Sequence, residues 1–156
     1  MTKVRVAFNE SEMRRKMSVL LETIGFKIEN RAKTICVREA FDTGELANSI
    51  SHEVDLGRSA VIVGSNAPHA LYNEFGTGFR GAAAYRQYFD EEKPEFTIPI
   101  VIEPKTKKAL HWVGKDGKHH FAKRVESLGR KPVAFLRRSL FEGQGDIKES
   151  VKEVFK

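Results

Sequence analysis

The organisation of this chain is set by one stretch, Ala67-Pro-His-Ala-Leu-Tyr-Asn-Glu-Phe-Gly-Thr-Gly78. A turn signal, one amphipathic helical turn and two glycines around a threonine predict a short helix that ends in a permissive loop. Gly76 and Gly78 can adopt a positive φ without steric cost, so they allow the backbone to leave the helix sharply and to approach another segment closely. Thr77 can hydrogen-bond the backbone groups that are freed there. The stretch therefore indicates a structural junction and not a catalytic site.

A second motif lies upstream, in Asp42-Thr-Gly-Glu-Leu-Ala-Asn-Ser49. Gly44 supplies a turn, and Asp42 and Thr43 can cap the elements on either side of it. Leu46 is expected to point inward as an anchor. After this motif we expect the chain to enter a sheet directly.

Two segments between these motifs have the pattern of paired strands. Ser49–Asp55 alternates with period two, and Ser59–Ser65 is more continuously apolar. Leu56–Ser59 between them is typical of a turn. Together they predict a β-hairpin that leads into the first stretch.

The N-terminal third predicts one long helix, from about Glu10 to Phe41. Asn9 and Glu12 have the spacing of a capping box. Gly25 inside the helix indicates either close packing or a bend. Apolar side chains recur about every 3.6 residues along one face, at Met13, Met17, Leu20, Ile24, Ile28, Ala32 and Ile35. Upstream of the helix, Lys3–Phe8 alternates polar and apolar residues and predicts a short strand.

The middle of the chain is less regular. Gly81–Phe89 is compatible with a further helical turn or with a loop. Phe96–Ile102 predicts a strand, which Pro99 confines to an edge or a bulge because proline donates no ladder hydrogen bond. Ala109–Val113 and His120–Val125 predict a second hairpin, with Asp116-Gly117 at its turn.

The C-terminal part predicts helical structure. Val133–Phe141 is expected to begin a helix, which Gly143 and Gly145 interrupt. A closing amphipathic stretch contains Ile147, Val151, Val154 and Phe155.

The composition is that of a single globular domain. The chain has 156 residues, of which 40% are hydrophobic, enough for a sizeable core. It starts without an apolar signal region and has no run of about eighteen apolar residues, so we expect synthesis in the cytoplasm and no membrane insertion. The single cysteine, Cys36, cannot form an internal disulfide and is expected in the core.

The net charge of +6 is concentrated in one segment. Residues 105–138 contain 11 basic and 2 acidic side chains, whereas the segments before and after are slightly acidic. Clustered cations raise the local potential over a Debye length of about 8 Å, which suits DNA or an acidic protein surface. A solvated loop is the alternative explanation.

Catalytic patterns are weak. His119-His120 suggests a nuclease or metal site, but adjacent side chains on a strand point to opposite faces. Asp42-Thr-Gly44 resembles the aspartic-protease triplet, yet a long helix occupies the place where that fold needs strands. Glu74 is expected to bond backbone amides or an arginine. No P-loop or dinucleotide motif occurs, so we expect no enzyme, no metal and no cofactor.

Three motifs in order carry a family resemblance: Asp42-Thr-Gly-x-Leu-x-x-Ser49, Glu74-Phe-Gly-Thr-Gly78 and Pro132-Val-Ala-Phe-Leu-Arg-Arg-Ser-Leu140. With the hairpin between the first two, the chain resembles the tail-completion proteins of long-tailed bacteriophages, which are neck or head–tail joining components. The likeness spans nearly the whole chain. The family usually has a tyrosine before the loop, here Tyr72. The family usually has Pro-Phe-Leu near the start of the last helix. In this chain two residues separate Pro132 from Phe135 and Leu136.

The resemblance implies a structural role in virion assembly. The expected fold is α+β, with a long N-terminal helix packed on a mostly antiparallel sheet, hairpin arms and a C-terminal helix. The expected assembly is a hexameric ring at the neck of the virion, between the tail terminator and the head-closure proteins, with genomic DNA passing through it.

The second hairpin, at about 109–125, is the best candidate for an arm that reaches a neighbouring subunit. Its candidate interface residues are Trp112, Lys118, His119, Phe121, Lys123 and Arg124. Burial of the two aromatic side chains against the sheet is the competing interpretation. A small basic DNA-binding module of phage origin is the alternative function.

Overall fold

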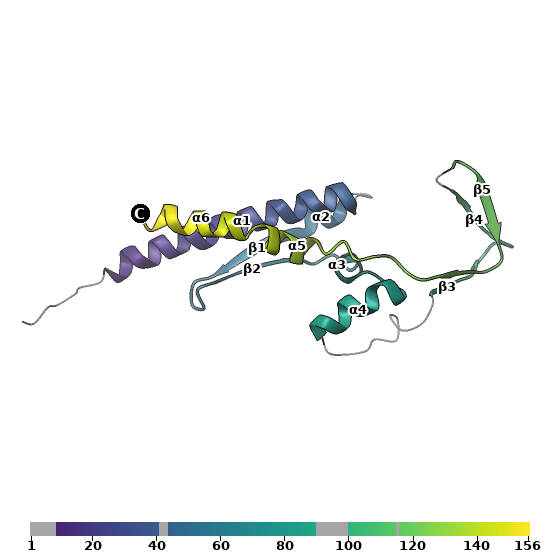
Figure 1. Cartoon of the computed structure of the whole chain (residues 1–156), viewed down its shortest axis with the longest axis horizontal. Helices are drawn as coiled ribbons and strands as arrows, with labels where there is room; N and C mark the ends of the chain where they lie inside the picture. The colour runs from purple at the N-terminus through teal and green to yellow at the C-terminus, as the bar shows by residue number, and fades with distance from the viewer. Residues whose placement is uncertain (1–8, 41–43, 90–99, 115) are drawn as a thin grey trace, which may run out of the picture. The chain divides into compact units, whose positions relative to one another are not determined.

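The computed structural model describes residues 9–40, 44–89, 100–114 and 116–156. Its contacts divide the chain into two compact units. Unit 1 combines residues 1–70 with residues 135–156, and unit 2 is the continuous segment 71–134. The architecture is α+β, with a long N-terminal helix, antiparallel strand pairs and C-terminal helices, as the sequence predicts (Figure 1).

Unit 1 is built on its first helix, against which two strands and two later helices pack (Figure 1). Its elements are α1 (Glu10–Glu39), α2 (Glu45–Ser49), β1 (Ile50–Asp55), β2 (Ala60–Ser65), α5 (Phe135–Glu142) and α6 (Gln144–Val154). Strands β1 and β2 form the predicted antiparallel hairpin, with Ile50 opposite Ser65 and Asp55 opposite Ala60. The predicted strand at residues 3–8 lies outside the described residues.

Helix α1 begins where its cap predicts. The Asn9 side chain accepts a hydrogen bond of 3.2 Å from the backbone N–H of Glu12, which satisfies one of the open donors of the first turn. The helix ends at Glu39, two residues before the predicted end. Its buried face contains Leu20, Leu21, Ile24, Ile28, Ala32, Ile35 and Cys36. Cys36 is therefore a core residue, as expected.

The prediction that Met13 belongs to this face is wrong. Its side chain is 43% exposed. In the described part of the chain, the core cluster on α1 begins one turn later, where Met17 packs against Leu20, Ile24 and Ile28. Periodicity alone marks an apolar stripe but not how far the packing partners extend along it.

Gly25 marks close packing. A Cβ atom built there would overlap the His52 ring, and it would lie 2.8 Å from Val61 Cγ2. Since His52 and Val61 lie on neighbouring positions of the inward face of the hairpin, the missing side chain lets the strands approach the helix closely.

The prediction that Ser49 opens the first strand is wrong, because Ser49 is the last residue of α2. Its hydroxyl donates a hydrogen bond of 2.7 Å to the carbonyl oxygen of Leu46, a local bond that supports the helical turn. Leu46 is buried, as expected of an anchor. Gly44 has a φ of +82° and makes the predicted turn. Asp42 and Thr43 lie outside the described residues.

His52 lies between two carboxylates of α1. Its Nδ1 is 2.5 Å from Glu29 Oε2, and its Nε2 is 3.2 Å from Glu22 Oε2. The hydrogen bond to Glu29 raises the pKa of His52 above its ordinary 6.5, and the bond to Glu22 adds to this effect. Hydrogen bonds from Lys33 and then from His52 lower the pKa of Glu29 below 4.5.

We expect this cluster to stabilise unit 1 most between about pH 4.5 and 6.5. The contribution of His52 is complete below 6.5 and is lost as pH rises through its raised folded-state pKa. The contribution of Glu29 is lost as pH falls below 4.5, through its lowered pKa. In urea unfolding, the free energy of unfolding should fall between about pH 5.5 and about pH 8.5, and this fall should be smaller in His52→Gln. The same fall in His52→Gln and in a control, His120→Gln, would contradict this assignment.

The C-terminal helices differ slightly from the prediction. Helix α5 starts at Phe135 and not at Val133. Ala134 has a φ of +56°, which is outside the helical region, so Val133 and Ala134 cannot belong to the helix. Gly143 separates α5 from α6 as predicted, but Gly145 lies inside α6.

Unit 2 contains α3 (Ala70–Phe75), which starts at its boundary, and α4 (Gly78–Phe89), β3 (Ile100–Ile102), β4 (Leu110–Val113), β5 (His119–Ala122) and β6 (Val125–Ser127). The segment 81–89, for which a loop was the alternative, is helical. Antiparallel pairs join β3 to β6 and β4 to β5. The prediction that Val125 ends the hairpin is wrong, because Val125 starts β6 and pairs with Ile102.

Part of the predicted strand 96–102, with Pro99, lies outside the described residues. Among the residues that the structure describes, no helix is both long enough and apolar enough to cross a membrane.

Candidate functional site

The Gly76-Thr77-Gly78 loop lies against a later segment of unit 2. Thr77 N–H donates to the carbonyl oxygen of Arg130 at 3.0 Å, and Arg130 N–H donates to Thr77 Oγ1 at 2.9 Å. Arg80 N–H donates to the carbonyl oxygen of Leu128 at 3.2 Å. Val133 N–H donates to the carbonyl oxygen of Asn73 at 2.8 Å. We call this arrangement of residues 73–80 and 128–133 the clasp.

Three glycines make the clasp possible. Gly76, Gly78 and Gly129 have φ values of +81°, +57° and +88°. A Cβ atom would lie 2.5 Å from the Arg130 carbonyl oxygen at Gly76 and 2.9 Å from the Leu128 carbonyl oxygen at Gly78. A Cβ atom at Gly129 would overlap the carbonyl oxygen of Thr77. The predicted close approach of this loop to another segment is thus confirmed.

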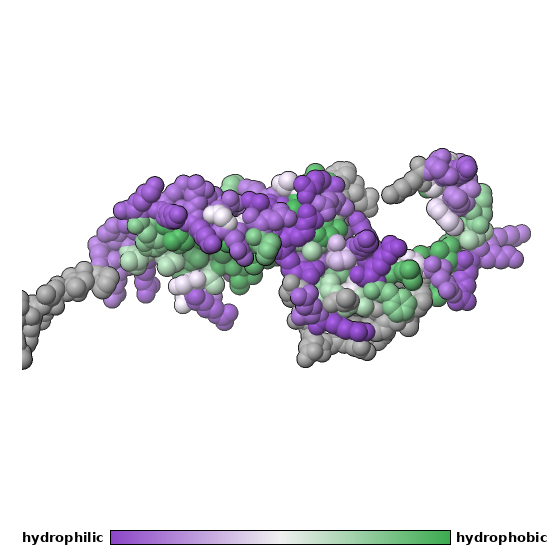
Figure 2. Space-filling view, viewed as in Figure 1, coloured by the Kyte–Doolittle hydropathy of each residue, from purple (hydrophilic) through white to green (hydrophobic). Residues whose placement is uncertain are grey.

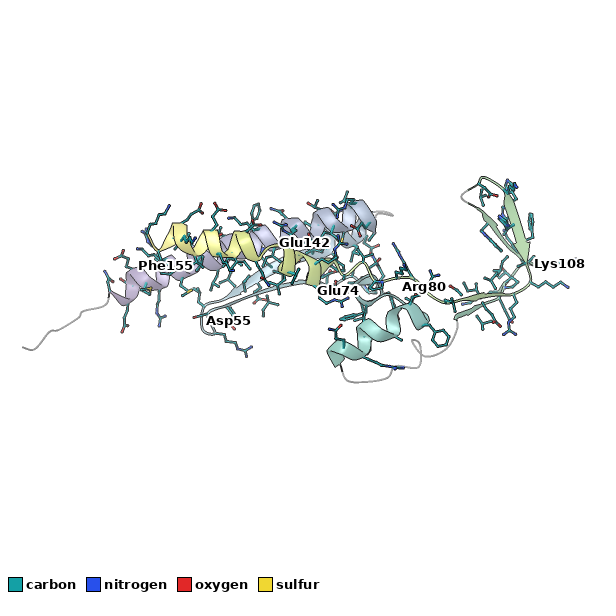
Figure 3. The ribbon with its side chains drawn as sticks, in the orientation of Figure 1. Asp55, Glu74, Arg80, Lys108, Glu142 and Phe155 are labelled. Atoms are coloured by element: carbon teal, nitrogen blue, oxygen red, sulfur yellow. The ribbon has the colours of Figure 1, made fainter. Side chains whose placement is uncertain are left out.

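Helix α3, whose second half belongs to the clasp, is well packed. Glu74 and Phe75 are buried, and the Phe75 ring meets Tyr85 edge to face, with centroids 5.6 Å apart. Glu74, labelled in Figure 3, is 5% exposed. Tyr72, by contrast, is 43% exposed.

The family motifs are spread over the two units. Glu74 to Gly78 and Pro132 meet in the clasp, where a Cβ atom at Gly76 would lie 2.8 Å from the Pro132 nitrogen. Tyr72 also belongs to unit 2, just before the clasp, and the motif residues described in unit 1 are Gly44, Leu46, Ser49, Phe135 and Leu136. Phe135 has 0% exposure, and the carbonyl oxygen of Leu136 accepts a hydrogen bond from Ser139 Oγ.

The β4–β5 hairpin, residues 110–122, is called the arm. Its turn is closed by hydrogen bonds between Gly114 N–H and the Lys118 carbonyl oxygen at 2.8 Å, and between Gly117 N–H and the Gly114 carbonyl oxygen at 2.9 Å. Gly117 has a φ of +74°, which confirms the predicted turn at Asp116-Gly117. In the sequence the arm is the continuation of the β3–β6 ribbon, and the clasp holds the chain just after β6.

The two aromatic candidates on the arm are exposed, so the interpretation that they are buried against the sheet is wrong. Trp112 is 43% exposed and Phe121 is 70% exposed. They lie on opposite faces of the ribbon, since Trp112 pairs with His120 and Phe121 pairs with His111. Ring stacking joins both pairs, with centroids 5.3 Å and 4.7 Å apart. The visible surface of the arm contains both hydrophobic and hydrophilic residues (Figure 2).

Basic residues flank these aromatic residues in the sequence. Figure 3 labels Lys108, whose side chain extends away from the ribbon. Lys118 lies 3.9 Å from Asp116, and Arg124 forms an ion pair of 2.8 Å with Glu126. The exposed basic residues of this segment are Lys105, Lys107, Lys108, Lys118, Lys123, Arg124, Arg130 and Lys131. The charge that the sequence concentrates here is therefore on the surface.

The arm also contains a pair that the sequence analysis missed. His119 and His120 do point to opposite faces, as predicted, but His119 lies beside His111, with Nδ1 and Nε2 2.8 Å apart. Counting the strand pairs outward from the Asp116-Gly117 turn places His119 opposite Val113. His111, two residues before Val113, is then on the same face as His119. No group of three or more His, Cys, Asp or Glu that could hold a metal occurs among the residues described.

None of the family models, curated proteins or solved structures compared with this chain matches it. The assignment of a function therefore depends on the clasp, the arm and the sequence motifs.

Proposed function

We propose that this chain is a structural, non-enzymatic subunit of the phage neck, which completes the tail and joins it to the DNA-filled head. The observation that carries the proposal is an exposed aromatic and basic arm on a ribbon that the clasp holds. The clasp contains the Glu74–Gly78 motif and the first two residues, Pro132 and Val133, of the third motif that resembles tail-completion proteins. Its residues are used for backbone bonding, which suits a scaffold better than an active site.

A ring needs two different surfaces on each subunit that meet when copies are related by rotation. The arm provides one such surface. Exposed Trp112 and Phe121 are of the residue class that contributes most to protein interfaces once buried. In the proposed hexamer each arm contacts a neighbouring subunit or the adjoining tail-terminator and head-closure proteins, and genomic DNA passes through the ring. The virion neck is then the site of action.

Electron microscopy of lysates from a phage or induced prophage that lacks this gene tests the proposal. We expect full heads beside complete but unattached tails, and joined particles after complementation with the intact gene. Joined, infectious particles without the gene would contradict the neck function. Hydrolytic activity that is lost on changing Asp42, Glu74 or His119 would contradict the non-enzymatic assignment.

The role of the arm is tested by complementation with the double variant Trp112→Ala, Phe121→Ala. Truncating an interface anchor costs about 2 kcal/mol or more, so we expect few or no joined particles from a protein that still folds. The matched control is Leu56→Ala, which truncates a side chain that is 52% exposed in unit 1. The control should restore joining, and full rescue by the arm variant would refute this role.

The exposed basic residues of the 105–131 segment favour a DNA-binding module as the second candidate. Binding of duplex DNA should then weaken steeply with salt, with a slope of about −0.9 for each phosphate that is neutralised. Lys118→Gln with Lys123→Gln should reduce that slope by about 2 if both contact phosphates. A steep slope together with normal particles in the deletion strain would favour this candidate over the neck function.

A further inference from the structure

The proposed function gives the histidine pair of the arm no chemical role, although His119 is one of the candidate interface residues. The β4–β5 register places His111 opposite Phe121 and His119 opposite Val113, so these four side chains lie on one face of the ribbon. His120 lies on the other face, opposite Trp112.

The two rings are held in a defined geometry. Nε2 of His111 and Nδ1 of His119 are 2.8 Å apart, the ring centroids are 5.1 Å apart and the ring planes differ by 1°. These values together put the rings nearly end to end in one plane, with one nitrogen donating its proton to the lone pair of the other. A hydrogen bond between imidazoles requires that at least one of them is neutral. Phe121 stacks on His111 at 4.7 Å and restricts its rotation.

We propose that His111 and His119 together form a binding site for a divalent transition-metal ion, with Zn²⁺ as the probe. Imidazole nitrogens bind Zn²⁺ at about 2.0–2.1 Å, so two of them at a tetrahedral angle are about 3.4 Å apart. The present separation of 2.8 Å has to widen by about 0.6 Å, and each ring has to turn by about 35° so that its lone pair points at the ion and no longer at the other ring. Both side chains are exposed, so rotations about their side-chain torsions can make these changes without moving the strands.

Metal binding requires no net loss of a proton from the pair. The proton between the rings moves to the outer nitrogen of the ring that carried it, and both inner nitrogens then offer lone pairs to the ion. Among the described residues no third ligand of the His, Cys, Asp or Glu type completes a site, so water fills the remaining positions. The site is open and weaker than closed structural zinc sites, and it does not depend on the proposed function.

Titration of the full chain with Zn²⁺ by isothermal calorimetry tests the site. We expect one ion per chain, and His111→Gln or His119→Gln should each lower the affinity by at least about tenfold, since even losing a supporting second-shell group costs that much. The matched control is His120→Gln, which removes the neighbouring histidine from the opposite face and should leave the affinity unchanged. All three side chains are exposed, so far-UV circular dichroism should show the same fold.

Absence of binding to the wild-type chain would overturn the proposal. So would affinity that both pair variants retain, or an equal loss in His120→Gln. A second measurement on the wild type avoids reliance on variants: electron paramagnetic resonance of added Cu²⁺ should show coupling to two imidazole nitrogens, and coupling to one or none would refute the pair.

Discussion

Replacement of Gly129 by alanine is expected to open the clasp and to destabilise unit 2 by more than about 3 kcal/mol. A Cβ atom at this position would overlap the carbonyl oxygen of Thr77, and the φ of +88° is unfavourable for any residue with a side chain. The obstacle is backbone and cannot be relieved by rotating a side chain, so the hydrogen bonds between residues 77–80 and 128–130 should be lost together.

Amide hydrogen exchange is the measurement that resolves this effect. The N–H groups of Thr77, Arg80 and Arg130 should lose protection in Gly129→Ala. The matched control is Gly117→Ala, because Gly117 also has a positive φ but no atom lies within 4 Å of the added Cβ. Gly117→Ala should lower the stability of unit 2 by only about 1 kcal/mol, the strain of a left-handed alanine. The amide groups of the clasp should stay protected from exchange. Equal losses in the two variants would show that the strain matters and the contact does not.

Replacement of Phe135 by alanine is expected to cost unit 1 about 3–5 kcal/mol. Phe135 has 0% exposure and opens helix α5, which packs against α1. Truncation removes a large apolar side chain and leaves a cavity that the surrounding side chains can fill only in part.

Urea unfolding followed by circular dichroism measures this cost. The matched control is Phe141→Ala in the same helix, because Phe141 is 75% exposed. The control should change the free energy of unfolding by no more than about 0.5 kcal/mol. A loss below about 1 kcal/mol in Phe135→Ala would contradict the assignment of Phe135 as a core residue of unit 1.

Local sequence patterns predicted the elements whose partners are close in the chain. The cap at Asn9 and the regular apolar spacing located α1, and the alternation on either side of residues 56–59 located the first hairpin. The positive φ values of Gly76 and Gly78 followed from the need for a sharp turn. These features depend on short-range geometry, which the sequence contains directly.

Other features depend on partners that are distant in the chain. The pairing of β3 with β6 joins residues 100–102 to 125–127, and no local pattern distinguished Val125 from the preceding hairpin. The segment that the Gly-Thr-Gly loop approaches is about fifty residues away, so the loop predicted a close contact but not its identity. The His111–His119 pair required the register of β4 and β5. Ser49 was misassigned because its hydroxyl bond to Leu46 competes with extended structure.

The discontinuity of unit 1 has a consequence for biosynthesis. Helices α5 and α6 follow the whole of unit 2 in the chain, although they pack against α1. On the ribosome, unit 2 can therefore close its clasp while the face of α1 that awaits Phe135, Ile147 and Val154 is still uncovered. A nascent chain at this stage exposes an apolar stripe on a formed helix, which is a surface that chaperones bind and that promotes aggregation.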